Sequence, residues 1–375
     1  MSKKDIIAKY LLQFTIAITV FSQMETLSEI FRPLMYIFWF ILLGYLLSVN
    51  VGKIKMSSFI ASYLFCYAIF LGLCLLQSWL DTDYEVASYL QIMVIPLLVS
   101  LISDLLHNKL SVNWIISTCK VYVFASIIFA LYINVTFFSS YQEWLASQVY
   151  LFASKNSAAQ IWCSAILILY FIILPVSKKK YFCYIGIVYL LILCGLSQCR
   201  TAILGLVCVL AYNILIHSKY KIKWILIICA SIVLLLVVPQ SREFISQAFL
   251  LEKYAGADMN TMSSGRLGLY SKAWDNFCES PLIGVGHYYV DCSYLYVLAE
   301  NGILGFLIIE FIWMKRIISN LSNNKLTYAR PYMLTSFVIF YFIESLLEGQ
   351  PPFGPGASSF MFWLLSEIKV GEEVG

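Results

Sequence analysis

The chain has 375 residues, of which 61% are hydrophobic and only 12% are charged. About a quarter of the residues in an average soluble domain are charged, and a globular core of this size cannot hide so much apolar surface from water. Composition therefore excludes an ordinary soluble protein and predicts an integral membrane protein. The formal net charge of +4 is too small to indicate a nucleic-acid partner.

Apolar stretches long enough to form membrane-spanning helices follow one another along almost the whole chain. We predict an all-α, polytopic transmembrane protein with about twelve such helices, in a single integral membrane domain over residues 1–375. The predicted spans are 6–22, 33–51, 56–80, 86–106, 112–137, 157–176, 181–198, 201–217, 224–239, 293–314, 331–348 and 356–368.

Lys and Arg residues are distributed unevenly over the connections between these spans. With the N-terminus placed in the cytoplasm, 17 of the 25 Lys and Arg residues lie on the cytoplasmic side and 7 on the outer side. Because short cytoplasmic connections carry an excess of Lys and Arg, this bias predicts that both termini are cytoplasmic.

Residues 240–292 are predicted to form a large outer loop inserted between two spans. Connections of this length are usually functional. Within the loop, Leu267, Tyr270, Trp274 and Phe277 recur at helical spacing and give one apolar face. We therefore expect one or two helices that lie on the outer membrane surface.

The sequence also predicts where the main loop helix begins and ends. Ser263 and Ser264 are candidates for its N-cap, because a serine hydroxyl can accept a hydrogen bond from a free N–H of the first turn. Pro281 is expected to end it. Gly284 and Gly286 then permit a tight turn back into the membrane.

Two arginines on the outer side are candidates for binding phosphate. Arg200 lies between two apolar runs, and Arg266 opens the predicted loop helix. A guanidinium group is planar, permanently charged and matched to phosphate oxygens, so this pair is suited to a lipid-linked diphosphate. The residues alone leave two alternatives open: Arg200 only reaches lipid headgroups, and Arg266 is an ordinary solvated loop residue.

Several carboxylates lie in or beside the last spans. Asp291 precedes the tenth predicted span, where it can accept a proton or a sugar hydroxyl or simply cap the helix. Glu300 is expected about two helical turns deeper in that span. Glu344 and Glu348 lie one turn apart in the eleventh; carboxylates are costly in a membrane and default to function, although Glu348 can also be an interfacial residue.

Three further residues are weaker candidates. Lys155 and Asn156 end the first long outer loop, and Asn156 can equally cap a helix. His287 is the only histidine on the outer side, and a lone loop histidine is more often a bystander. The three histidines and eleven cysteines show no metal-ligand spacing, and no phosphate-binding loop is present. We expect neither a metal ion nor a nucleotide cofactor.

Four sequence segments, by their order and spacing, resemble segments of the O-antigen polymerase and ligase superfamily of bacterial envelope glycan assembly. They resemble, in turn, an Asn that begins a span after an outer loop, the family's SRTA segment, the core of its large loop and the return of that loop into the membrane. The segments are Lys155-Asn-Ser157, Cys199-Arg-Thr-Ala202, Gly265-Arg266 with Trp274 and Pro281-Leu-Ile-Gly-Val-Gly286, and Asp291-Cys-Ser-Tyr-Leu295 with Glu300-Asn-Gly-Ile-Leu-Gly305.

One departure from the ligase pattern is informative. O-antigen ligases typically have a His followed by Asn or Ser at the start of the last motif, whereas this chain has Asp291, as polymerases of the superfamily often do. His287 does not replace the ligase histidine, because it is followed by Tyr288. The resemblance therefore favours a polymerase over a ligase.

The resemblance implies a GT-C-like membrane glycosyltransferase acting on the periplasmic face of the bacterial inner membrane. It implies a growing glycan on undecaprenyl diphosphate as donor and the non-reducing end of a single lipid-linked repeat unit as acceptor. Arg200 and Arg266 are expected to stabilise the leaving diphosphate, and Asp291 to orient or deprotonate the acceptor hydroxyl. The remaining candidates for substrate binding are Lys155, Asn156, His287, Glu344 and Glu348.

The resemblance also implies partners and leaves alternatives open. The expected partners are an undecaprenyl-diphosphate-linked oligosaccharide, the bilayer and a chain-length regulator protein. A ligase that transfers glycan to lipid A core is the first alternative. A polysaccharide transporter or flippase is the second, but it predicts internal symmetry and charges lining a central path, and the sequence shows neither.

Overall fold

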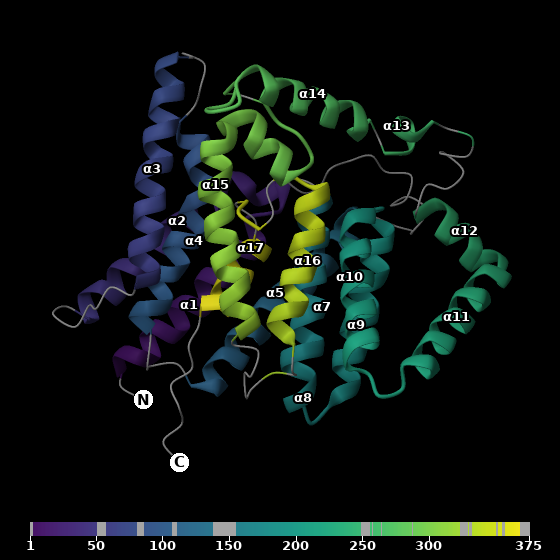
Figure 1. The fold of residues 1–375 in the computed structure, drawn as a ribbon. Helices are drawn as coiled ribbons and strands as arrows, with labels where there is room; N and C mark the ends of the chain where they lie inside the picture. Colours follow the sequence, from purple (N-terminus) through teal and green to yellow (C-terminus); the bar gives the residue numbers. More distant parts are fainter. Residues whose placement is uncertain are drawn as a thin grey trace.

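A computed structural model shows a bundle of helices, with no β-strand in the residues that it describes (Figure 1). Each of the twelve predicted spans coincides with a helical segment, so the all-α polytopic fold is confirmed. The described residues are 3–50, 58–80, 86–106, 111–137, 155–248, 256, 258–263, 265–286, 288–322, 329, 332–349, 352–354 and 357–367.

The helices differ in length, and so in their ability to cross a bilayer. Within the described ranges, six are long and apolar enough to span, and three shorter apolar helices accompany them. The helical elements are α1 (Lys3–Phe21), α2 (Glu25–Val49), α3 (Ser58–Leu80), α4 (Val86–Leu106), α5 (Val112–Phe137), α7 (Lys155–Ile168), the π-helical turn η1 (Leu169–Ile173), α8 (Leu174–Val176), α9 (Lys180–Leu196), α10 (Arg200–Tyr212), the π-helical turn η2 (Asn213–His217), α11 (Lys221–Val237), α12 (Pro239–Ala248), α13 (Met259–Met262), α14 (Arg266–Glu279), α15 (Ser293–Ser322), α16 (Met333–Leu347) and α17 (Ala357–Glu367).

Helix α9 shows how the bundle is adapted to lipid. Leu190 and Leu193 are buried against neighbouring helices, whereas Ile185 and Val188 are exposed on its other side. A helix that faced water would carry polar residues on its exposed side. An apolar exposed side is instead suited to a bilayer, which supports a multi-pass membrane protein.

The two ends of the bundle are different. Helix α14 of the predicted outer loop lies across one end, above α15 and α16 (Figure 1). The lysine-rich connections that follow α8 and η2 lie at the opposite end. This arrangement agrees with the sidedness that the Lys and Arg bias predicts.

The predicted loop helix is present as α14, but it begins later than expected. Its N-cap is Gly265, in the left-handed conformation at φ +81°, rather than a serine. Ser263 still contributes, because its Oγ accepts a hydrogen bond from the Leu267 N–H at 3.3 Å; Ser264 lies outside the described residues. The helix ends at Glu279, before Pro281, as predicted.

Helix α15 contains the predicted span 293–314, and it is bent into two limbs at Gly302, a bend that the sequence analysis did not predict. Gly302 has φ +61° and ψ −166°, which is not helical. The loop that follows α14 packs into the bend: Val285 donates to the Ala299 carbonyl at 2.8 Å, and Ile303 donates to the Pro281 carbonyl at 2.9 Å. The loop therefore satisfies backbone groups that the bend frees from the helix.

Glycines make this close approach possible. A Cβ atom on Gly302 would overlap the Leu282 backbone, and one on Gly284 would overlap the Glu300 backbone. Glu300 lies about two helical turns after the start of α15, as predicted, within the stretch Ser293–Ser319 that is long and apolar enough to span a membrane. It lies beside the outer loop, where its Oε1 accepts a hydrogen bond from the Tyr288 N–H at 3.3 Å.

Candidate functional site

Close packing of α10 against α16 brings the outer ends of these helices together. Gly205 of α10 lies so near Phe340 of α16 that a Cβ atom would come within 2.8 Å of the ring. Thr201, one turn earlier on α10, consequently meets Glu348, which ends α16.

Glu348 is the centre of the site. Its carboxylate accepts hydrogen bonds from Asn156 Nδ2 of α7 at 2.7 Å, from Thr201 Oγ1 at 3.1 Å and from Arg266 Nη2 of α14 at 3.0 Å. Its side chain is only 7% exposed. Three donors from three helices hold this buried carboxylate, which fits an ionised group.

Arg266 joins Glu348 to the second carboxylate of the site. The Arg266 Nε lies 3.3 Å from Asp291 Oδ2, and the Asp291 side chain is 30% exposed. Burial opposes the charge on Arg266, but the neighbouring Glu348 and Asp291 carboxylates raise its pKa. The helix-cap alternative for Asp291 is not what these contacts show, since its carboxylate pairs with Arg266.

Two tyrosines surround Asp291. Tyr270 of α14 donates its hydroxyl to the Asp291 carbonyl at 2.7 Å, and burial raises its pKa to about 12. Burial also raises the pKa of Tyr289, and the Asp291 charge adds to the effect. Both phenols therefore stay protonated near neutral pH and are available as hydrogen-bond donors.

Arg200 reaches the same loop from the first turn of α10. Its Nη1 donates to the Met262 carbonyl at 3.3 Å, four residues before Arg266 in the chain. Of the two arginines predicted from the sequence, Arg200 therefore contacts the end of α13 and Arg266 begins α14.

Glu344 lies one turn below Glu348 and is fully buried. Its Oε2 accepts a hydrogen bond from Gln160 Nε2 of α7 at 2.8 Å. At 0% exposure it has no surface on which to contact a substrate, so the expected substrate-binding role is not supported by this geometry.

The structure does not describe the side chains of two candidates that the sequence suggested. Lys155 is the first residue of α7, but its side chain is not described, and His287 lies outside the described residues. Both remain predictions. Of the remaining candidates, Asp291 and Glu348 are the groups suited to hold a cation, and in this structure both already share Arg266.

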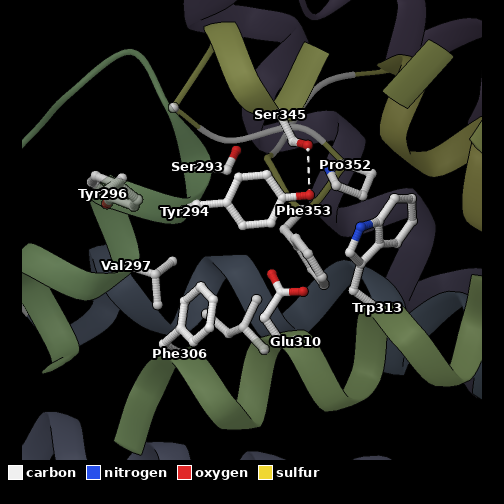
Figure 2. A pocket seen from close by; sticks show the side chains of 12 residues that line it. Ser293, Tyr294, Tyr296, Val297, Phe306, Glu310, Trp313, Ser345, Pro352 and Phe353 are labelled. Atoms are coloured by element: carbon white, nitrogen blue, oxygen red, sulfur yellow. Dashed lines mark hydrogen bonds between the residues drawn. The ribbon is translucent and has the colours of Figure 1, made fainter. Parts of the chain in front are cut away.

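An apolar pocket adjoins the site between the two limbs of α15, α16 and the chain that follows α16. Figure 2 shows the Glu310 carboxylate pointing into it, below the Tyr294 hydroxyl, which accepts a hydrogen bond from Ser345 at 3.2 Å. Its empty volume, including its open mouth, is about 380 Å³. Ser293 connects pocket and site, because its Oγ donates to the Glu348 carbonyl at 2.9 Å.

Sequence reasoning missed several members of the site. The sequence gives no role to Thr201, although it lies in the Cys199-Arg-Thr-Ala202 segment, and no pattern in the sequence points directly to Gln160. The signal for Gln160 is its spacing: it lies four residues after Asn156 on α7, just as Glu344 lies four residues before Glu348 on α16.

Comparison with known families agrees with this arrangement. Residues 185–309 match the family model described as O-antigen ligase. No curated protein matches the chain. The matched segment contains Arg200, Arg266 and Asp291, while Asn156 and Glu348 lie outside it. The match supports a place for this multi-pass membrane protein in the bacterial O-antigen ligase and polymerase superfamily, without separating ligase from polymerase.

Proposed function

We propose that the protein is a surface-polysaccharide polymerase. It transfers a growing glycan from undecaprenyl diphosphate to the non-reducing end of a new lipid-linked repeat unit, at the periplasmic face of the inner membrane, with both termini in the cytoplasm. The observation that carries this proposal is the position of Arg266, the first residue of the loop helix α14, held between Asp291 and Glu348. A chain-length regulator protein is a further proposed partner.

The arginines suit the leaving group. As the bond between the donor sugar C1 and the diphosphate oxygen breaks, negative charge grows on the diphosphate. Arg266 uses one N–H towards each of two carboxylates, and a guanidinium group has about five N–H donors in total. Donors therefore remain for phosphate oxygens, and Arg200 supplies a second positive charge. Fixed positive charge at a partly desolvated site stabilises such a transition state.

Asp291 suits the acceptor better than Glu348 does. Its side chain is 30% exposed, whereas that of Glu348 is 7% exposed and already accepts three hydrogen bonds. In the proposed step, the acceptor hydroxyl oxygen bonds to C1 of the donor sugar and its proton passes to Asp291. Undecaprenyl diphosphate leaves, and Glu348 keeps Arg266 in place.

Two variants test this function in a strain that depends on the protein. Arg200→Ala and Asp291→Asn should each leave lipid A carrying single repeat units with little polymer. Arg242→Ala, which removes an exposed arginine of α12, is the matched control and should give a full ladder. Normal polymer from both site variants, at normal protein amounts, would refute the assignment.

Ligase activity is the second candidate, because the matching family model is described as O-antigen ligase. The deletion strain separates the two functions. Loss of a polymerase leaves single repeats attached to lipid A, whereas loss of a ligase leaves polymer that never reaches lipid A. Asp291 in place of the ligase histidine favours the first outcome.

We also propose that the reaction needs no metal ion, because the Arg200 and Arg266 guanidinium groups can donate hydrogen bonds to the diphosphate oxygens. Purified protein with a lipid-linked substrate should keep its activity in EDTA. Loss of activity that a divalent ion restores would contradict this part of the proposal.

A further inference from the structure

Two matched hydrogen bonds join α7 to α16 like the rungs of a ladder. The upper rung is Asn156 to Glu348, at 2.7 Å, and the lower rung is Gln160 to Glu344, at 2.8 Å. Each helix contributes residues four apart, so both rungs lie on one face of each helix. The upper rung belongs to the candidate site, and the lower rung lies in the core.

The lower rung is closed to solvent. Glu344 is 0% exposed and Gln160 is 8% exposed. Glu344 Oε1 has no hydrogen-bond partner among the described residues. A buried carboxylate without a paired cation is costly, and such a group becomes neutral instead.

The charges around Glu344 lead to the same conclusion. Among the described residues, the cation that interacts with Glu344 is Arg266, which is already paired with Glu348 and Asp291. A charged Glu344 would be a third anion beside one arginine. The titratable and charged groups that interact with it are Glu348 and Tyr341 on α16, Cys163 on α7, Cys199 before α10 and Arg266 on α14.

We propose that Glu344 is a protonated positioning residue. Its neutral rung with Gln160 sets the register of α16 against α7, so that Asn156 and Glu348 meet at the outer end. It does this without adding a charge that would compete with the proposed diphosphate for Arg266. The protonation state is independent of the proposed function, whereas the consequence for activity rests on it.

Infrared difference spectroscopy of the full-length protein in lipid nanodiscs tests the protonation state. The carbonyl stretch of a protonated carboxylic acid should be present at pH 7 in the wild type and lost in Glu344→Gln. Glu310→Gln is the control: it removes a different intramembrane carboxyl and should leave the Glu344 band. A Glu344→Gln spectrum without a lost carboxylic acid band overturns the proposal, whatever reaction the protein performs.

Polymerisation by purified protein tests the positioning role. Glu344→Gln replaces a neutral acid with a neutral amide and should keep kcat within about threefold of the wild type. Gln160→Leu should lower kcat by about 10- to 100-fold, the size expected when a distant change misplaces a reacting group. It should leave the pH profile unchanged.

The double variant Gln160→Glu/Glu344→Gln rebuilds the rung with its partners exchanged. It should recover most of the activity that Gln160→Leu loses, with thermal unfolding equal to that of the wild type. Failure to recover in a normally folded protein overturns the positioning role, as does a Glu344→Gln variant as inactive as Arg266→Ala. If the wild type makes no polymer in the same assay, the proposed function fails instead, and the infrared result stands.

Discussion

Among the residues that the structure describes, two arginine–carboxylate clusters lie at opposite ends of the bundle, and they differ in how their charges are matched. At the outer end, Arg266 faces two carboxylates, and Asp291 is 30% exposed. At the other end, Arg316 pairs with Glu367; their side chains are 3% and 10% exposed. The first cluster has an excess of acid and an open side, whereas the second is closed and balanced.

The surroundings of Arg316 explain its role. Its Nη1 donates to the Ser366 carbonyl at 2.8 Å, and its guanidinium group lies 5.9 Å from the centre of the Trp363 ring. Ser100 of α4 donates to Glu367 at 2.8 Å. Every one of these groups fixes α17 to the bundle. A matched, closed pair of this kind stabilises the fold, whereas an open pair with spare donors is suited to a ligand.

Among the substitutions that test this difference between the clusters, we expect the largest effect on activity from Arg266→Ala. Removing one preorganised donor of a transition-state site lowers kcat by about 10²- to 10³-fold. We expect a loss of at least this size in polymer formed per unit of protein, measured on gels of lipid-linked products. The same change leaves the buried Glu348 carboxylate without its cation, so the unfolding temperature should fall as well, and activity is compared at equal amounts of folded protein. A stable Arg266→Ala protein with normal activity would show that the Arg266 cluster is not needed for the reaction.

Arg316→Ala should act on stability instead. It leaves Glu367 as a buried, unpaired carboxylate, and breaking a buried pair in this way costs about 3–5 kcal/mol. We expect a large decrease in unfolding temperature and little protein in the membrane. Lys315→Ala is the matched control, because Lys315 is less buried and donates to Ser62 at 2.7 Å. Equal stability of the two variants would show that the Arg316 pair does not anchor α17.

The bend of α15 offers a third test, because it places Asp291 beside Arg266. Gly302→Ala puts a methyl group where the Leu282 backbone lies, at a backbone conformation that costs other residues about 1–3 kcal/mol. We expect lower unfolding temperature and lower activity together. Gly72→Ala in α3 meets open space and should be neutral or slightly stabilising. Gly302→Ala with wild-type stability would show that the bend tolerates a side chain.

Much of the fold was predictable because it depends on local composition. Apolar runs give helices in a bilayer, and the predicted spans agree with the observed helices from α1 to α17. The bend at Gly302 was not predicted, because it depends on a loop about 20 residues earlier that fills the bend. The Asn301-Gly302 pair within an apolar run was the available signal.

Part of the candidate site was also predictable from local stretches of sequence. Arg200, Arg266 and Asp291 belong to segments that resemble a family, so the sequence alone makes each a candidate. The sequence does not separate the roles of Glu344 and Glu348, because the two residues lie only one helical turn apart. Glu348 nevertheless lies at the partly open site, whereas Glu344 lies in the closed core. Only packing between α7, α10 and α16 shows which carboxylate reaches Arg266.

The smallest expected effect concerns Gln77, which lies outside the segment that matches the family model. This residue of α3 is 4% exposed, and its amide donates to the carbonyls of Ile283 and Gly284 in the loop that fills the α15 bend. Gln77→Leu leaves buried acceptors without this donor, at a cost of about 1–3 kcal/mol. Because the loop leads directly to Asp291, we expect activity to fall as well as stability.

The matched control for Gln77→Leu is Gln13→Leu, which removes a hydrogen bond of 2.7 Å to Ser117 between α1 and α5. Both variants should lower the unfolding temperature by a similar small amount, but only Gln77→Leu should lower kcat, because only Gln77 contacts the loop between Arg266 and Asp291. Equal activity of the two variants would show that the loop holds its position without α3. The placement of Asp291 would then depend on the α15 bend and on the Tyr270 hydrogen bond to its carbonyl, and not on α3.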